Sequence, residues 1–238
     1  CGNTSSVSQT INVNDNVAPV APEAPATITV ACAGDVPAMV SLTAQDNCNG
    51  AITVEGVDAV AQGECANSFV VTRTWTFVDA CGNTSSVSQT INVNDNVAPT
   101  IDVQASNIIV ECDGNGNQSA LMNWLQSNGG ATASDNCSNV TWTNNFDAMS
   151  NDCSAAVTVV FTATDACGNI ASTTATFTVN DTQDPVAPEA PAAVTVACAD
   201  DVPAMVALTA TDNCSNTITV EGVDTIAQGE CANSFVVT

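Results

Sequence analysis

Apolar and polar residues alternate along this chain in short segments, a pattern that predicts β-strands. Between residues 17 and 96 these segments lie at 26–30, 40–43, 51–54 and from 69 onward. They are rich in β-branched residues and are bounded by Asn, Asp, Gly or Pro, as strands commonly are. No helical periodicity runs through them. The pattern therefore predicts an all-β domain.

The longest predicted strand pair flanks residues 79–83, where a Gly-Asn step favours a tight turn. The apolar residues that alternate along this hairpin are Phe69, Val71, Trp75, Phe77, Val87, Ile91 and Val93. Several short strands separated by regular turn signals, without helices between them, are typical of an antiparallel, immunoglobulin-like β-sandwich of about seven strands.

Long stretches of the sequence occur twice. Residues 1–19 recur without change at 81–99, and residues 20–72 recur almost unchanged at 186–238. The prolines that open successive copies are 80 and 86 residues apart. Periods of this length indicate a tandem array of small domains, because each unit is large enough to bury a modest core.

We therefore divide the chain into repeats joined by short Pro-containing linkers. The parts are the last hairpin of a preceding repeat at 1–16, a first repeat at 17–96, a second repeat at 97–182 with a loop insertion at 113–130, and a third repeat at 183–238 that is truncated before its last hairpin. Both ends of the chain fall inside repeats. We expect the sequence to be a window on a longer polypeptide.

The charge of the chain is strongly one-sided. It has 25 acidic residues, no Lys, no His and one basic residue, Arg73, so its formal net charge is −24. Nucleic acids and anionic membranes would repel such a chain, whereas cations would be attracted. The alternative is that the acidity only keeps the array soluble. Arg73 lies on an apolar strand face, and we expect it to pair with Glu55 of a neighbouring strand.

Twelve cysteines at repeating positions indicate an oxidising, extracellular compartment. Strands run from one pole of a repeat to the other, which places Cys32 and Cys65 at the C-terminal pole and Cys48 and Cys81 at the N-terminal pole. Bonds between cysteines of one pole would give two disulfides per repeat. The predicted pairs are Cys32–Cys65, Cys48–Cys81, Cys112–Cys153, Cys137–Cys167 and Cys198–Cys231, and Cys1 and Cys214 have no partner within the chain.

The same strand order brings three acidic elements together at each linker, namely the linker itself, a loop and the hairpin turn. The residues are Asp15, Asp46 and Asp79 at the first linker, Asp95, Asp135 and Asp165 at the second, and Asp181, Asp184 and Asp212 at the third. Converging carboxylates without Lys or Arg suit a hard divalent cation with many oxygen ligands, and Ca²⁺ better than Mg²⁺. The alternative is that these residues only start turns.

Other acidic residues give weaker signals. Residues 113–117 look like the start of a calcium loop, but Trp124 stands where an EF-hand needs its closing Glu, so a turn is the better interpretation. Glu residues at several equivalent positions, Glu55, Glu64, Glu111, Glu221 and Glu230, lack any His, Lys or Tyr that would complete a catalytic pair. We predict no enzyme activity.

Residues 119–126 in the second repeat are the exception to the β pattern and predict a short helix. Met122 and Trp124 would then cover the core as a lid. The alternative is a sugar-binding surface that uses Trp124 and Trp142, because carbohydrate sites favour exposed Trp.

Residues 43–47 and 76–83 of the first repeat, together with 161–169 of the second, resemble the hyaline repeat family, whose members are immunoglobulin-like modules of extracellular adhesive proteins. The motifs Asp-Asn-Cys, Asp-Ala-Cys-Gly-Asn and Asn-Asp-Asn-Val-Ala-Pro are similar to cysteine-containing repeats in giant cell-surface adhesins of Bacteroidota, including gliding-motility adhesins exported by type 9 secretion. The resemblance implies an adhesin stalk or surface filament.

Taken together, these patterns predict a calcium-stiffened, disulfide-stapled spacer in a long extracellular surface protein. The alternative function is a module that binds carbohydrate or another cell. The expected partners are copies of the chain itself or other fibre chains, and a polysaccharide or cell surface under the alternative. We expect no nucleic-acid partner and no membrane insertion of this segment.

Overall fold

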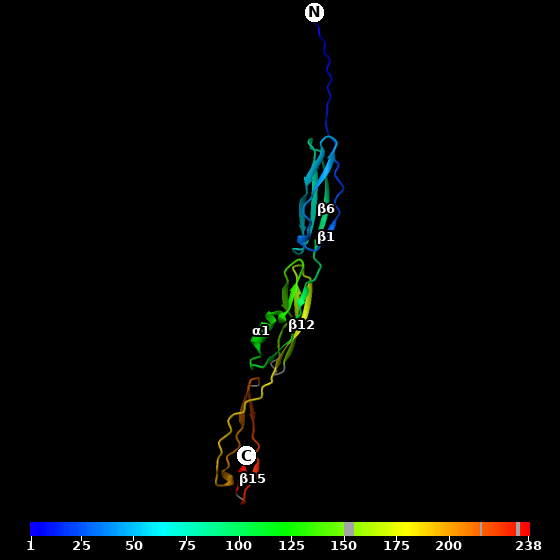
Figure 1. Cartoon of the computed structure of the whole chain (residues 1–238). Coiled ribbons are helices and arrows are strands. Elements are labelled where there is room, and N and C mark those ends of the chain that lie inside the picture. The colour runs from blue at the N-terminus through cyan, green and yellow to red at the C-terminus, as the bar shows by residue number, and fades with distance from the viewer. Residues whose placement is uncertain (150–154, 215, 232–233) are drawn as a thin grey trace. The chain divides into compact units, whose positions relative to one another are not determined.

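The computed structural model describes residues 1–149, 155–214, 216–231 and 234–238 (Figure 1). Within this part of the chain, strands dominate and the helical elements are few and short. The chain divides into two compact units. Unit 1 comprises 1–100, 133–141 and 163–171, and unit 2 comprises 101–132, 142–162 and 172–238. Two loops of the second repeat therefore belong with the first repeat.

The first repeat is a sandwich of a four-stranded and a two-stranded sheet. The larger sheet has the order β1-β6-β5-β4, with strands at Ile28–Val30, Thr84–Asn94, Ser68–Val78 and Val57–Gln62. The smaller sheet pairs β2 (Ser41–Asp46) with β3 (Gly50–Glu55). A bridge from Val20 to Gln45 joins the linker to β2. A one-turn 3-10 helix, η1 (Ala33–Asp35), follows β1.

The core of the first repeat lies where the sequence pattern predicts it. Trp75 and Phe77 of β5 are fully buried against Ala44 of β2. Trp75 also donates its indole N–H to the Val40 carbonyl at 2.8 Å, which satisfies the polar group of a large buried side chain. Ile91 and Val93 of β6 are buried as well. The predicted alternation along this hairpin is therefore confirmed.

Two features of the sheet differ from the prediction. The β1 strand pairs with β6 in parallel, from Ile28 opposite Ile91 to Val30 opposite Val93. The sandwich is thus antiparallel except at this edge. The strand β4 was not expected, because its residues are small or exposed and carry no clear alternation.

The second repeat has the same plan with an inserted helix. Its larger sheet has the order β10-β11-β12-β8. These strands span Thr141–Asn144, Ala156–Thr164, Ile170–Asn180 and Ile108–Glu111, in that order. As β1 does with β6 in the first repeat, β8 pairs in parallel with β12. A second pair consists of β7 (Thr100–Val103) and β9 (Thr132–Ser134). The helix α1 spans Gln118–Gln126, and the turn η2 (Asn128–Gly130) follows it.

The predicted lid is confirmed for Trp124 and not for Met122. Trp124 is 6% exposed and stacks edge-on against Phe161, with ring centroids 5.2 Å apart. Its indole N–H donates to the Ser106 carbonyl at 3.0 Å. Leu121 and Leu125 complete the buried face of α1, whereas Met122 is 48% exposed on the other face. Helical periodicity explains the difference, because positions 121, 124 and 125 share one face.

The third repeat is sparser in regular structure. Its strands pair as β13 (Leu208–Asp212) with β14 (Asn216–Val220) and as β15 (Ile226–Gln228) with β16 (Phe235–Val237). The turn η3 (Ala199–Asp201) repeats η1. Val186 bridges to Thr211 as Val20 does to Gln45. The repeat therefore keeps the local geometry of the first one.

Arg73 is only 4% exposed, and it pairs with Asp58 rather than with Glu55. Residues 58 and 73 are directly opposite on β4 and β5. The guanidinium donates to both carboxylate oxygens, at 2.8 and 3.0 Å, and to the carbonyls of Pro37 and Ala38. The prediction of Glu55 was wrong because β4, which follows β3 in the chain and pairs with β5, was not predicted.

The substitution Asp58→Ala tests the Arg73–Asp58 pair. It leaves a buried guanidinium without its carboxylate, which lowers the free energy of unfolding by about 3 kcal/mol. This corresponds to about a hundredfold change in the equilibrium constant for opening of the sheet at β5. We expect amides of β5 to exchange hydrogen faster by about that factor, measured by mass spectrometry. Glu55→Ala, at an exposed position, is the control and leaves exchange within about twofold. Equal exchange in both variants would contradict the role of the pair.

The pair also makes stability depend on acid. The hydrogen bonds from Arg73, opposed by desolvation, hold the pKa of Asp58 below its usual value. A depressed carboxyl pKa contributes stability that is present above the unfolded pKa of about 3.9 and is lost as the pH falls through the lower folded value. We expect exchange of the β5 amides to accelerate below about pH 4 in the wild type, and this extra acceleration to be absent in Asp58→Ala.

Candidate functional site at the repeat boundaries

An aspartate organises each hairpin turn. In the first repeat the Asp79 carboxylate accepts hydrogen bonds at Oδ1 from the backbone N–H groups of Cys81 and Asn83, at 2.9 and 2.8 Å. The Asn83 side chain donates to Asp79 Oδ2 at 2.7 Å and to the Asp15 carbonyl at 3.3 Å. Gly82 adopts a φ of +87°, which only glycine takes without strain. The hairpin turn is thereby fixed against the linker.

Three carboxylates meet beside this turn. One oxygen each of Asp15, Asp46 and Asp79 lies within 4.8 Å of the others. Asp46 comes from the end of β2 and is 9% exposed, and Asp79 follows β5 and is 6% exposed. The linker, the loop and the hairpin therefore converge as the strand order predicts. No basic residue is available to neutralise them, because Arg73 is bound to Asp58.

Two of these carboxylates have an oxygen without a partner. Asp46 Oδ1 accepts from the N–H groups of Cys48 and Asn49, at 3.0 and 2.6 Å, and Asp15 Oδ1 accepts from Val17 at 3.1 Å. The Oδ2 atoms of Asp15 and Asp46 are buried and have no hydrogen-bond partner. A buried charged oxygen without a partner is costly, so this geometry favours a bound cation.

The second boundary repeats the arrangement. Asp95, 5% exposed, follows β6, and Asp135 follows β9, and both again have a buried, unpartnered Oδ2. Ligand atoms of Asp95, Asp135 and Cys137 lie within 4.8 Å of one another, so Cys137, and not the predicted Asp165, is the third member of this group. Its sulfur is bonded to Cys32 and is no thiolate ligand. The Asp165 carboxylate accepts from Asn169 at both oxygens, at 2.9 and 2.7 Å, as Asp79 does from Asn83. Asn169 donates to the Asp95 carbonyl at 3.2 Å.

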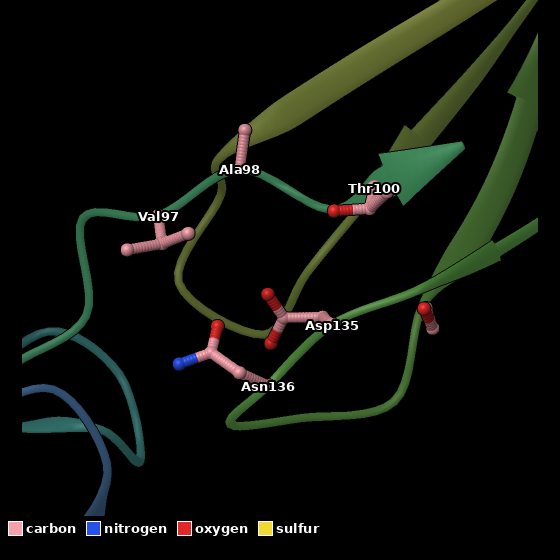
Figure 2. A pocket seen from close by; sticks show the side chains of 6 residues that line it. Val97, Ala98, Thr100, Asp135 and Asn136 are labelled. Carbon is pink, nitrogen blue, oxygen red and sulfur yellow. The ribbon is translucent and has the colours of Figure 1, made fainter. Parts of the chain in front are cut away.

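A cavity of about 360 Å³ opens beside this second group (Figure 2). It is lined by the linker residues Val97, Ala98 and Thr100 and by Ser134, Asp135 and Asn136. The Asp135 side chain points into the space between the linker and the loop. The cavity is large enough for a hydrated cation, and its lining is about half polar.

The third linker differs in the part of the chain that the structure describes. No three-carboxylate cluster forms there around Asp181, Asp184 and Asp212. Asp181 accepts from the Gln183 N–H at 3.2 Å, and Asp212 accepts from the Cys214 N–H at 2.8 Å. Both keep the turn geometry of their equivalents without the convergence.

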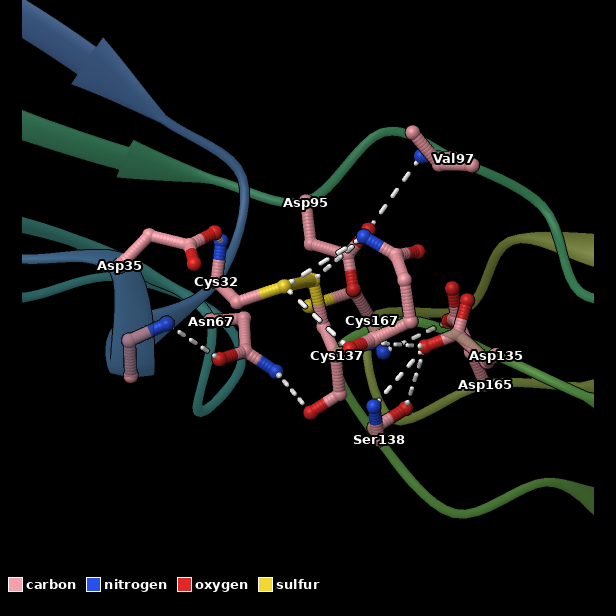
Figure 3. The surroundings of a disulfide bond; sticks show 12 residues. Cys32, Asp35, Asn67, Asp95, Val97, Asp135, Cys137, Ser138, Asp165 and Cys167 are labelled. Atoms are coloured by element: carbon pink, nitrogen blue, oxygen red, sulfur yellow. Dashed lines mark hydrogen bonds between the residues drawn. A yellow bond between two sulfur atoms is a disulfide. The ribbon is translucent and has the colours of Figure 1, made fainter.

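Among the described residues, three disulfides join cysteines of successive repeats. They are Cys32–Cys137, Cys65–Cys167 and Cys112–Cys214, with Cα–Cα distances of 5.0, 5.1 and 5.3 Å and sequence separations of 105, 102 and 102 residues. Figure 3 shows the Cys32–Cys137 bond and the acidic residues drawn around it. The described cysteines that remain free are Cys1, Cys48, Cys81, Cys198 and Cys231, and all of them are exposed.

The predicted pairing within repeats is therefore wrong. Cys32 follows β1 and Cys65 precedes β5, and β6 lies between these strands. Two strand spacings amount to about 9.5 Å, beyond the reach of about 7 Å between bonded Cα atoms. Each cysteine instead faces one of the following repeat.

The other predicted pairs whose cysteines the structure describes are not observed either. The pairing of Cys137 with Cys167 is replaced by their bonds to the first repeat, and Cys112 bonds to Cys214. Cys153 lies outside the described residues. The predicted pairs Cys48–Cys81 and Cys198–Cys231 are not bonded. Cys48 lies between β2 and β3 and Cys81 lies between β5 and β6, so the two thiols are at the same end of the repeat without being bonded.

Asparagines reinforce the disulfides. Asn67 is 6% exposed, accepts from the Ala33 N–H at 2.9 Å and donates to the Cys137 carbonyl at 3.2 Å. Asn213 donates to the Cys112 carbonyl at 2.7 Å at the next boundary. Asn67 was not predicted from the sequence, although the triplet Cys-Ala-Asn at 65–67 recurs at 231–233. That recurrence is the signal that could have identified it.

Hydrogen bonds also shift the pKa of several carboxyls at these boundaries. The Asn83 side chain holds the pKa of Asp79 below its usual value. For Asp165, desolvation raises the pKa, but the hydrogen bonds from Asn169, Cys167 and Gly168 together outweigh it and the net pKa is lowered. Thr182 lowers the pKa of Glu111 by donating its N–H and hydroxyl. These groups stay ionised, which suits cation binding at Asp79 and Asp165 and makes Glu111 a structural acceptor.

Desolvation is the main cause that raises the pKa of the Cys48 thiol, and the nearby Asp15 carboxylate is the next.

Asp113 forms a turn, as predicted. Its Oδ1 accepts hydrogen bonds from the N–H groups of Asn115 and Asn117 at 2.8 and 2.9 Å. Hydrogen bonds from those two residues lower the pKa of Asp113.

A family model described as a HYR-like domain with 4 cysteines matches residues 20–93. This range covers nearly all of the first repeat and supports the resemblance to hyaline repeats. A search of curated proteins found no match.

Two of the solved structures with a loose likeness are the extracellular parts of cell-surface proteins. Extracellular cadherin domains 1–4 of protocadherin gamma B7 match at 10% identity and a TM-score of 0.30, over 92% of this chain and 67% of that chain. The human desmocollin-1 ectodomain matches at 10% identity and a TM-score of 0.23, over 92% of this chain and 52% of that chain. Among the described residues, no helix is long and apolar enough to cross a membrane.

The disulfide pairing can be tested by cleavage after Arg73, the only basic residue. In a Cys48→Ser variant, alkylated at free thiols and unfolded in urea without reductant, a protease that cuts after Arg yields fragments 1–73 and 74–238. We expect these fragments to stay joined on a non-reducing gel, because Cys32–Cys137 and Cys65–Cys167 both connect them. Reductant should separate them.

Pairing within the repeats would give the opposite result, since a Cys32–Cys65 bond lies entirely inside fragment 1–73. The matched control adds Cys32→Ser and Cys65→Ser to the same background. This control should separate without reductant. Separation of the Cys48→Ser variant itself would contradict the observed pairing.

Proposed function

We propose that the chain is a structural repeat region of a long extracellular adhesin or filament, in which calcium and disulfides stiffen the connections between repeats. The HYR-like match over residues 20–93 fits an extracellular, structural role. Disulfides that join successive repeats are typical of an oxidising compartment. The motif resemblance to gliding-motility adhesins further suggests a Bacteroidota surface protein exported by type 9 secretion.

The observation that carries the calcium proposal is the pair of unpartnered Oδ2 atoms at each of the first two boundaries. Carboxylates this close repel one another, and burial strengthens the repulsion. A divalent cation removes the repulsion and supplies the missing partner at once. The donors are carboxylate, amide and carbonyl oxygens, which are the ligands that Ca²⁺ prefers.

The residues that would hold the ion come from three elements. At the first boundary they are Asp15 of the linker, Asp46 of the loop and Asp79 of the turn, and at the second they are Asp95, Asp135 and Asp165 in the same roles. The linker aspartate is thereby tied to the repeat that follows it. A linker held at both the ion and the nearby disulfide bends less than one held at its ends alone.

A carbohydrate-binding role has less support. Trp124 is buried and satisfied within the core, and Trp142 is half-buried and packs against the same core. Neither side chain offers the exposed ring that a sugar site uses. Likewise, the acidic pairs considered for catalysis have no His or Lys near them, because the chain contains none. We therefore keep the spacer role and expect no enzyme activity.

Calcium binding is tested by isothermal titration of the full chain after treatment with EDTA. We expect two sites with a Kd on the order of 10⁻⁴ to 10⁻³ M, as in extracellular calcium modules. Asp95→Asn should remove one site and Asp15→Asn together with Asp95→Asn should remove both. Asp224→Asn, which changes the same charge at an exposed position, is the control and should keep two sites.

Two sites in the Asp95→Asn variant would contradict the assignment. The stiffening is tested separately by small-angle scattering of the full chain with and without calcium. We expect the radius of gyration to change on chelation in the wild type and in Asp224→Asn, but not in the doubly substituted variant. An unchanged scattering curve in a wild type that binds two ions would refute the spacer mechanism and leave the binding sites intact.

A further inference from the structure

The second boundary combines unsatisfied carboxylates with a cavity. Asp135 belongs to both, since it lies in the group with Asp95 and it lines the cavity of about 360 Å³. The residues of this group and of the cavity wall are all part of unit 1. Figure 2 shows the Asp135 carboxylate in the space between the linker and the loop that carries Asn136. A molecule in the cavity would therefore lie beside the proposed calcium ion.

The protein supplies only part of the coordination that calcium needs. The Oδ1 atoms of Asp95 and Asp135 accept hydrogen bonds from backbone N–H groups, so their unpartnered Oδ2 atoms are the oxygens left for an ion. Both oxygens of Asp165 already accept from Asn169. Ca²⁺ takes about six to eight oxygen ligands. Positions on the ion thus stay open for oxygen atoms that enter from the cavity.

The walls of the cavity suit a sugar. Thr100 and Ser134 carry hydroxyls, Asn136 carries an amide, and the linker adds two apolar side chains. Asn136 donates its amide N–H groups to the sulfurs of Cys32 and Cys137, at 3.4 and 3.1 Å, which leaves its carbonyl oxygen as an acceptor. A sugar ring has the same mixture of hydroxyls and apolar C–H groups. The volume of about 360 Å³ is near the lower end of the range of about 300–1,000 Å³ for small-molecule sites, so the cavity fits a single sugar unit.

The two hydroxyls distinguish this boundary from the first one. The first repeat has Val20 at the position of Thr100 and Gln45 at the position of Ser134. Val20 and Gln45 exchange backbone hydrogen bonds at 2.7 and 3.1 Å, so the linker and the loop are neighbours there as well. The second boundary therefore offers short hydroxyl side chains where the first offers an apolar and a longer one.

The charge of the chain restricts what can bind. With a net charge of −24, and with its one basic residue, Arg73, bound to Asp58, the chain repels anions and has no cationic side chain to hold one. The charge of a calcium ion would be balanced by Asp95 and Asp135. The molecule that fits is therefore neutral and rich in oxygen atoms, as an uncharged sugar with adjacent hydroxyls is.

We propose that this cavity binds one sugar unit of a neutral polysaccharide, with two adjacent hydroxyl oxygens completing the coordination of the calcium ion held by Asp95 and Asp135. The sugar site rests on the proposed calcium binding and gives the ion at the second boundary a ligand. It does not need the exposed ring that Trp124 and Trp142 fail to offer, because the ion recognises hydroxyl oxygens directly.

Saturation-transfer NMR of the full chain detects weak binding of this kind. The probes are the methyl glycosides of mannose, galactose and glucose, which are neutral and carry adjacent hydroxyls. We expect transfer to at least one of them with about 10 mM calcium, above the expected Kd of the ion, and none after EDTA.

The outcomes separate the sugar site from the calcium site. No transfer to any of the three sugars, from a chain that binds two calcium ions, would overturn the sugar site and leave the calcium proposal intact. A chain that binds no calcium would refute both. Transfer that persists in EDTA would overturn the role of the ion.

The cavity is tested by Thr100→Val with Ser134→Gln, which gives the second boundary the side chains of the first. We expect this variant to bind two calcium ions but to bind the sugar about tenfold more weakly, the effect of a lost hydrogen bond. The control, Thr76→Val with Ser86→Gln, makes the same changes at opposite, exposed residues of β5 and β6 and should keep the sugar affinity. Equal affinity in both variants would contradict the assignment to the cavity.

The ion is tested by comparing its two sites. Asp95→Asn should abolish transfer to the sugar together with one calcium site, whereas Asp15→Asn should remove the other calcium site and keep the sugar. Sugar binding that survives Asp95→Asn, or that is lost in Asp15→Asn, would overturn the proposal.

Discussion

Disulfides that cross a repeat boundary set the constraints under which the other contacts form. A bond such as Cys65–Cys167 closes more than 100 residues, and the loss of entropy that it imposes on the unfolded chain is worth about 4–5 kcal/mol for such a loop taken alone. A domain of this size has a thin core, so this contribution is a large share of its stability. Because the bond joins two repeats, a repeat that unfolds stays tethered to its neighbour.

Disulfides anchor the acidic turns at the second boundary. The hairpin turn after Asp165 contains Cys167, and the loop after Asp135 contains Cys137, so each disulfide holds one of these elements. The first boundary has converging carboxylates as well, although its cysteines Cys48 and Cys81 are free. The strand order and the hydrogen bonds within each turn therefore bring the carboxylates together, and the disulfides add a covalent link to the same elements.

Local signals in the sequence were sufficient to predict the core face of the long hairpin and the converging carboxylates. Alternation in 69–77 identified the core face with Trp75, and the turn residues placed Asp15, Asp46 and Asp79 at one pole. The pairing of cysteines was not recoverable in the same way. Each pole holds two thiols of its own and faces two more, and only the strand order, with β6 between β1 and β5, excludes the nearer pair in sequence. That order depends on a parallel β1–β6 contact, for which alternation gives no signal.

A repeat that shares its disulfides with a neighbour is not an independent unit. Cys32 and Cys65 of the first repeat bond to two loops of the second, and these loops lie in the same compact unit as the first repeat. Folding of a repeat and its attachment to the next are therefore coupled, because the bonds that fix one end of the first repeat are those that hold the second.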